Sequence, residues 1–285
     1  VNHALLLSDL AHGGGLIPNY DHLVIDEAHH LEDEATRQLG LQVSQEWGRE
    51  SLDNLERLLQ AVLRLQSRQA FSDNQWEYIR NVETKIKKDI PKMLQSWDYT
   101  WSLIYELMTS YEREFNAGLQ LRVTQSVRNQ PKWDELEISW DNCSINLLET
   151  QSRIERLIQY LEDLDFGKGL GLDLIISDLD TLFDGMNQIR NRMDAIVGAN
   201  NDQSNIHWIT KTASGTLGLN VAPLNIAPHL KSELIDQKSS VIFTSATLGT
   251  AGNFDFIRQR LGLEDVDELM VDSPFDYLNT ILLAL

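Results

Sequence analysis

The stretch from His22 to Leu31 holds the side chains best suited to chemistry. It reads HLVIDEAHHL, in which three apolar and mostly β-branched residues run directly into Asp26 and Glu27. This pattern predicts a buried strand with two carboxylates at its carboxyl end, where open α/β sheets bind ligands. An Asp there can hold Mg²⁺, and the next Glu can activate a water that attacks a γ-phosphate. The stretch is a candidate Walker B element of DEAH type; the alternative is a polar turn whose acids begin the next helix.

A second apolar run, residues 241–243, also ends in short polar residues. The sequence TSATLG follows, so Thr244, Ser245 and Thr247 come just after the predicted strand. Their hydroxyl groups can hydrogen-bond a phosphate, a carboxylate or one another. Alone, the segment would be an ordinary polar turn. Beside the DEAH stretch it resembles helicase motif III, and we predict that Asp26 and Ser245 face one nucleotide pocket.

Four segments, in this order, resemble the DinG/XPD family of superfamily 2 DNA helicases. They are VNHALLL at residues 1–7, DEAH at 26–29, TSATL at 244–248 and SPFDY at 273–277. The segment from Trp208 to Ile226 is similar to the family's stretch before motif III. At the level of motifs, the resemblance covers roughly the first 40 and the last 80 residues.

This resemblance implies an ATP-dependent DNA helicase, an ATP hydrolase that moves 5′ to 3′ along single-stranded DNA in repair or replication. ATP and Mg²⁺ would be its cofactors. Asp26 would hold the Mg²⁺ and Glu27 would activate water. Four polar residues would couple hydrolysis to movement along DNA: His29, Thr244, Ser245 and Thr247. Two residues match a motif near the DNA path: Asn2 and His3.

The predicted fold class is α/β plus α, a partial RecA-like P-loop motor domain with parallel strands, interrupted by a mostly helical insertion. Residues 1–37 would carry motif II, and residues 206–285 the rest of the motor domain with motif III. Within the latter part, strands are expected at 206–210 and 217–221, and helices at 228–235 and 254–261. The insertion, residues 38–205, has the position of the family's arch domain, which helps to form an opening for single-stranded DNA.

The insertion shows helical periodicity over most of its length. Apolar residues recur at steps of three and four in its first helix: Leu52, Leu55, Leu58, Leu59, Val62 and Leu65. Three further helices are predicted at 72–115, 142–164 and 170–198, and a polar exit loop at 200–205. Pro91 should kink or break the second helix. The alternating stretches 119–123 and 136–140 could form a hairpin around Pro131.

The overall charge restricts where nucleic acid could bind. The chain has a net charge of −19, with 43 acidic and 24 basic residues, so DNA contact should be confined to a local basic strip or groove. One such strip falls in the insertion: Lys85, Lys87, Lys88 and Lys92. The alternative is a solvated helix face. Trp76, Trp97 and Trp101 could stack bases, although at helical spacing they more often form a core.

Composition also restricts which cofactors the chain could bind and where in the cell the protein is expected. The single Cys143 excludes a disulfide within the chain and any cysteine-ligated cluster built from this chain alone. No run reaches the roughly 18 apolar residues of a membrane helix, and no signal peptide is visible, so a cytoplasmic protein without membrane contact is expected.

A phosphate-binding loop is not found in the sequence. The only Gly-Lys pair, Gly167-Lys168, is followed by Gly169 and lacks the preceding Gly of a P-loop, so it predicts a flexible connection between helices. We therefore expect the 285 residues to belong to a longer protein and to be inactive alone. The family's phosphate loop, and the iron–sulfur cysteines of those members that have them, lie upstream of the matched region.

Two other functional classes remain open. Some relatives carry a nuclease domain as their principal activity, so the chain could be the helicase-like region of a DinG-type exonuclease. Alternatively, the acidic insertion could dock protein partners rather than DNA. A zinc site at His29 and His30 lacks a recognised ligand spacing, and an esterase site at His12–Gly15 lacks a nucleophile elbow.

Overall fold

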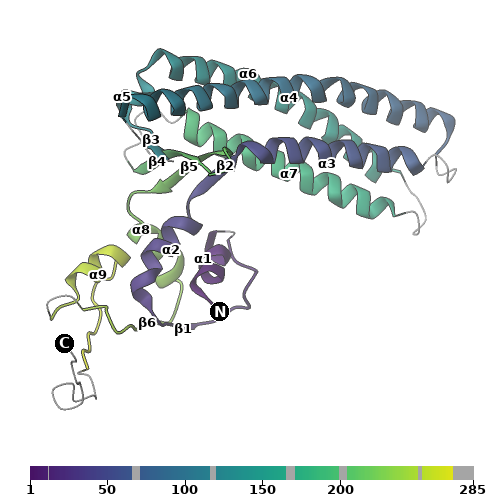
Figure 1. Cartoon of the computed structure of the whole chain (residues 1–285). Coiled ribbons are helices and arrows are strands. Elements are labelled where there is room, and N and C mark those ends of the chain that lie inside the picture. Colours follow the sequence, from purple (N-terminus) through teal and green to yellow (C-terminus); the bar gives the residue numbers. More distant parts are fainter. Residues whose placement is uncertain are drawn as a thin grey trace, which may run out of the picture. The chain divides into compact units, whose positions relative to one another are not determined.

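The computed structural model describes residues 1–11, 13–65, 71–115, 120–164, 171–198, 204–249 and 252–271 (Figure 1). It divides into two compact units. One, the parallel-sheet unit, combines Val1–Gly40 with Pro223–Leu285, and the other, the helical unit, is Leu41–Ala222. Two predicted segments, Gly167–Gly169 and Ser273–Tyr277, lie outside the described residues.

The parallel-sheet unit is built on two strands, β1 (His22–Ile25) and β6 (Ser240–Phe243). They pair in parallel with His22 opposite Ser240 and Ile25 opposite Phe243, so both carboxyl ends lie at the same edge. This confirms both predicted strands and their parallel direction. The other elements of this unit are short helices: α1 (His3–Ala11), η1 (Ala28–His30), α2 (Leu31–Gln38), α8 (Ala227–His229), η3 (Leu230–Ile235) and α9 (Asp255–Leu261).

A small apolar core fixes this unit. Leu7, Ile25 and Leu31 are almost completely buried in it, and η3 and α9 contribute Leu230 and Leu261. Because Ile25 ends β1 and Leu31 begins α2, the intervening residues 26–30 are anchored at both sides, and the buried Ala28 anchors them in the middle. The core therefore positions the DEAH stretch at the end of the strand.

The helical unit is a closed arrangement of four helices. These are α3 (Gln45–Arg64), α4 (Asp73–Phe115), α6 (Pro131–Glu162) and α7 (Leu172–Val197), and the short α5 is Gln125–Arg128. In order around the bundle, α3 packs on α4, α4 on α6, α6 on α7 and α7 on α3 (Figure 1). Trp101 and Trp133 are fully buried at its centre. Trp76 and Trp97 are also buried in this core, as their helical spacing predicts.

A four-stranded sheet completes the helical unit. Its strands are β2 (Leu41–Ser44), β3 (Gln120–Arg122), β4 (Asn205–Lys211) and β5 (Leu217–Pro223), in the order β2-β5-β4-β3. β2 pairs antiparallel with β5, and β3 with β4. The strands predicted at 206–210 and 217–221 are present, but they belong to the unit that ends at Ala222, whereas we expected this unit to end at 205. The reason is that Ile209 and Leu219 are buried in the core of the bundle.

One prediction for the helical unit is wrong, and one alternative of a second is excluded. The segment 136–140 is not a strand of a hairpin but part of α6, because Trp133, Leu136, Trp140 and Cys143 are buried together at helical spacing. At Pro91 we expected a kink or a break, and the break is absent, because α4 continues through this residue from Asp73 to Phe115. Pro91 is exposed, and burial of the neighbouring Ile90 and Met93 stabilises the helix on both sides. Among the described helices, none has the length and apolar character needed to cross a membrane.

Candidate functional site

Polar residues from two distant segments meet where β1 and β6 end. The backbone pairing continues past both strands, since the Thr244 amide donates to the Ile25 carbonyl at 2.8 Å and the Ala28 amide donates to the Thr244 carbonyl at 3.1 Å. Asp26 and Ser245 are therefore held at one edge of the sheet. The predicted juxtaposition of the DEAH and TSATL segments is confirmed.

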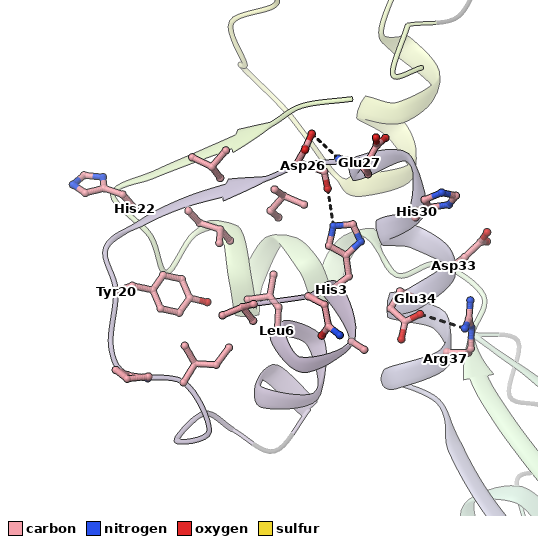
Figure 2. A pocket seen from close by; sticks show the side chains of 18 of the residues that line it. His3, Leu6, Tyr20, His22, Asp26, Glu27, His30, Asp33, Glu34 and Arg37 are labelled. Atoms are coloured by element: carbon pink, nitrogen blue, oxygen red, sulfur yellow. Dashed lines mark hydrogen bonds and ion pairs between the residues drawn. The ribbon is translucent and has the colours of Figure 1, made fainter. Parts of the chain in front are cut away.

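Asp26 is exposed, and its backbone is fixed by a neighbouring helix. The ring of His3, from α1, donates from Nε2 to the Asp26 carbonyl oxygen at 2.8 Å, and the Glu27 amide donates to Asp26 Oδ1 at 3.0 Å (Figure 2). One carboxylate oxygen thus has a fixed partner, and the carboxylate remains open to solvent. No group of three or more potential metal ligands occurs in the part of the chain that the structure describes. Asp26 fits Mg²⁺, which commonly uses one or two carboxylates and takes its other ligands from phosphates and water.

Glu27 adopts a backbone conformation that is rare for its residue type. Its φ of 52° and ψ of 39° place it in the left-handed region, where a residue with a Cβ is strained. Its side chain is held across the sheet, because the Ser245 hydroxyl donates to Glu27 Oε2 at 3.2 Å. Such strain concentrates at functional sites, where surrounding contacts maintain it.

Ser245 is the centre of this polar cluster. Its Oγ lies 2.7 Å from His29 Nδ1 and accepts a hydrogen bond from the Thr247 amide at 3.2 Å. His29 Nδ1 is also 3.3 Å from Glu27 Oε2. Side-chain contacts thus join the first polar segment to the second through a cluster of Glu27, His29, Ser245 and Thr247. A displacement of either segment would therefore shift side chains of the other.

A cleft of about 1030 Å³ opens beside Asp26 and Glu27 (Figure 2). Its wall comes from α1, the loop at 17–20, β1 and α2. His30, at the end of η1, also lines it, and three lining residues on α2 were not assigned to the site from the sequence: Asp33, Glu34 and Arg37. Their spacing of three and four residues places them on one helix face, which is the signal that could have identified them. The cleft is large enough for a nucleotide-sized ligand.

Of the remaining candidate residues, Asn2 lines the same cleft as Asp26, whereas the four lysines belong to the helical unit. Asn2 Oδ1 accepts from the Leu5 amide at 2.9 Å, so Asn2 caps α1. In the helical unit, Lys87 forms an ion pair with the buried Glu83. The other three lysines of the basic strip are exposed and make no ion pair with any described residue: Lys85, Lys88 and Lys92.

Comparison with known proteins shows similarity along the whole chain. No profile of a protein family matches it. The ATP-dependent DNA helicases YoaA of Haemophilus influenzae and Escherichia coli are 25% and 26% identical to it over its full length. The 3′-5′ exonuclease DinG of Bacillus subtilis is 22% identical over 97% of the chain. The chain spans 38%, 38% and 30% of these relatives, respectively, so it resembles about a third of each. The predicted resemblance to DinG-type helicases is confirmed.

Proposed function

We propose that the parallel-sheet unit is part of an ATP-driven motor that moves 5′ to 3′ along single-stranded DNA, with the helical unit as its inserted arch. The observation that carries the proposal is the contact of Ser245 with Glu27 and His29 at the shared carboxyl ends of β1 and β6. An arrangement of this kind lets the residue that activates water respond to a second chain segment. The names of the helicase relatives support the same reaction.

Each side chain of the cluster would have a distinct role. Asp26 would hold Mg²⁺, which when bound neutralises charge on the nucleotide phosphates. Glu27 would accept a proton from the attacking water, with its carboxylate oriented by the Ser245 hydroxyl. His29, Ser245 and Thr247 would transmit changes between the nucleotide and the DNA, together with Thr244 in the extended backbone pairing. His3 would keep the end of β1 in place through the Asp26 carbonyl.

The DNA-binding role would be shared between the two units. Asn2 and His3 would lie near the DNA path of the motor, and the exposed lysines of α4 would contact the phosphate backbone. The exposed apolar residues Val24 and Ile242, which are paired neighbours on β1 and β6, favour further covering of this sheet in a full-length protein. We also propose that the protein acts on DNA in the cytoplasm.

The test is DNA-stimulated ATP turnover by a full-length protein carrying this chain. Glu27→Gln should lower kcat by about 100-fold or more while changing KM for ATP little, because it removes the base but keeps the side-chain size. Asp26→Asn should raise the Mg²⁺ concentration required. A matched change at an exposed position of the helical unit, Glu50→Gln, should leave kcat within about twofold. Wild-type turnover by Glu27→Gln would overturn the proposal.

The 285-residue chain provides a second test. Because its sequence contains no phosphate-binding loop, the purified chain should hydrolyse no ATP above background. Measurable turnover that Glu27→Gln abolishes would contradict this part of the proposal.

One alternative is favoured by the name of the Bacillus subtilis relative, a 3′-5′ exonuclease. In that case the chain would be the helicase-like region of a nuclease. Within the described residues no cluster of three metal-binding side chains is present. Nuclease activity that persists in a Glu27→Gln variant of the full-length protein, without any ATP turnover in the wild type, would favour this alternative.

A further inference from the structure

A basic pocket lies on the outer surface of the helical unit, between α4 and α6. It has a volume of about 300 Å³ and is lined by Tyr78, Asn81, Val82, Lys85, Arg153 and Arg156. Three of these six side chains are cationic and none is a carboxylate. The chain as a whole has 43 acidic and only 24 basic residues, so the pocket has a local excess of positive charge on a chain that is negative overall.

Two of the three cations have no internal partner. Arg153 is held by an ion pair with Asp89, which is only 7% exposed, and lies 3.9 Å from Glu149. Lys85 and Arg156 form no ion pair with any residue that the structure describes. Their charges repel one another and Arg153 across the pocket, so an anion bound there would relieve this repulsion.

The positive charge continues along α4 beyond the pocket. Lys88 and Lys92 follow Lys85 by three and seven residues, which places them about 4.5 Å and about 10 Å further along the helix axis on the same side. Lys87 instead lies on another side of the helix, where it pairs with Glu83. A row of unpaired cations matches a ligand with repeated phosphates better than a single phosphate ion.

Aromatic rings lie next to these cations. Tyr78 is 39% exposed at the pocket, and its ring centroid is 4.1 Å from that of Tyr160 on α6. A cationic groove with an exposed aromatic ring is the pattern by which proteins bind single-stranded nucleic acid without sequence preference. The Asn81 amide adds both a hydrogen-bond donor and an acceptor.

We propose that this pocket binds the phosphate backbone of single-stranded DNA, with Lys85, Arg153 and Arg156 on the phosphates and Tyr78 against a base. The inference deepens the proposed function by locating a DNA contact in the helical unit. It rests on that function only for the choice of DNA as the ligand. Arg153 and Arg156 join the lysine strip because the packing of α6 on α4 brings them to it, and Tyr78 lies on α4 itself.

The experiment is a fluorescence-anisotropy titration of the 285-residue chain with a labelled oligothymidylate of about 15 nucleotides, at about 50 mM and about 200 mM salt. The double variant Lys85→Ala/Arg156→Ala should bind at least tenfold more weakly at the lower salt. It should also reduce the slope of log affinity against log salt by about 1.4, the value for two lost phosphate contacts on a single strand.

The matched control is Arg49→Ala/Lys132→Ala. It removes the same charge from two exposed positions of the helical unit, where the side chains pair with Asp98 and Glu106. It should bind within about twofold of wild type. Equal weakening by both double variants, or no binding by the wild type at the lower salt, overturns the proposal. Circular dichroism melts of all variants verify that each is folded.

Two further variants separate stacking from charge. Tyr78→Phe should bind like wild type, whereas Tyr78→Ala should bind at least fivefold more weakly, because stacking needs the ring and not the hydroxyl. Polyglutamate that displaces the oligonucleotide at equal charge concentration would assign the pocket to an acidic protein partner and overturn the DNA assignment. The titration contains no ATP and needs no turnover, so failure of the motor proposal and failure of this one give different results.

Discussion

In the helical unit, polar side chains between helices bond to one another, whereas in the parallel-sheet unit they gather at the open end of two strands. Thr100 Oγ1 and Ser139 Oγ, both buried, are 2.9 Å apart. Gln151 Nε2 donates to Asn187 Oδ1 at 2.8 Å. The Glu27 carboxylate, by contrast, is exposed and bonded to Ser245 at the sheet edge. The two buried pairs of the helical unit are used internally, whereas the carboxylate at the sheet edge stays available to a ligand.

The two units also differ in how they use backbone geometry. In the helical unit, the buried Arg128 donates to the carbonyl oxygens of Ile196 and Val197 at 2.9 and 3.0 Å, which satisfies the end of α7. In the parallel-sheet unit, Glu27 is held in a left-handed conformation that its residue type disfavours. The helical unit satisfies the carbonyl acceptors at the end of α7, and the parallel-sheet unit maintains a strained backbone at Glu27. This contrast supports the assignment of chemistry to the parallel-sheet unit.

The largest effect on stability is expected from a substitution at Gly48 in α3, which would disrupt the close packing that we ascribe to the helical unit. A Cβ placed there would lie 2.3 Å from the ring of Trp97, which is buried and donates from Nε1 to the Gln45 carbonyl at 2.9 Å. Gly48→Ala should therefore lower the free energy of unfolding of the helical unit by about 1–3 kcal/mol. All seven tryptophans lie between residues 41 and 222, so denaturation followed by tryptophan fluorescence reports this unit.

The control for Gly48 is Gly185 in α7. A Cβ at Gly185 would lie 3.6 Å from the Trp47 ring, an ordinary contact. Gly185→Ala should keep stability unchanged or raise it by up to about 1 kcal/mol, because Ala favours helix. Equal destabilisation by both variants would show that the bundle is not packed as tightly around Trp97 as described.

A smaller effect, which leaves the fold unchanged, is expected in the chemical reactivity of Cys143. It tests whether the core of the helical unit is closed to solvent. The residue is 1% exposed, and burial raises the pKa of its thiol to about 11. Since the thiolate is the reactive form and the pKa is raised, alkylation by iodoacetamide at pH 8 should be at least about 100-fold slower in the native chain than in urea. The rate should increase with pH toward 11. Rapid native labelling at pH 8 would contradict a closed helical core.

The sequence was most informative where a strand leads directly into polar residues. The apolar runs before Asp26 and Thr244 fix both strands of the parallel pair, because parallel strands are apolar along their length. It was misleading at Leu136–Trp140, where alternation over five residues also fits one face of a helix. Local pattern cannot separate these two cases when the helix is buried on several sides.

The remaining features depend on tertiary packing that a single sequence does not encode locally. The bond from His3 to the Asp26 carbonyl requires α1 to lie beside the end of β1. The assignment of β4 and β5 to the helical unit depends on their pairing with β2 and β3, which are distant in the chain. Likewise, Arg153 and Arg156 meet Lys85 only through the packing of α4 on α6.

The most direct test of the central claim is a double-mutant cycle between Glu27 and Ser245, measured as DNA-stimulated ATP turnover by a full-length protein carrying this chain. If the Ser245 hydroxyl acts through the Glu27 carboxylate, Ser245→Ala should slow turnover in the wild-type background and have almost no further effect in the Glu27→Gln background. Equal factors of loss in the two backgrounds would show that the two residues act independently and would contradict a shared nucleotide site.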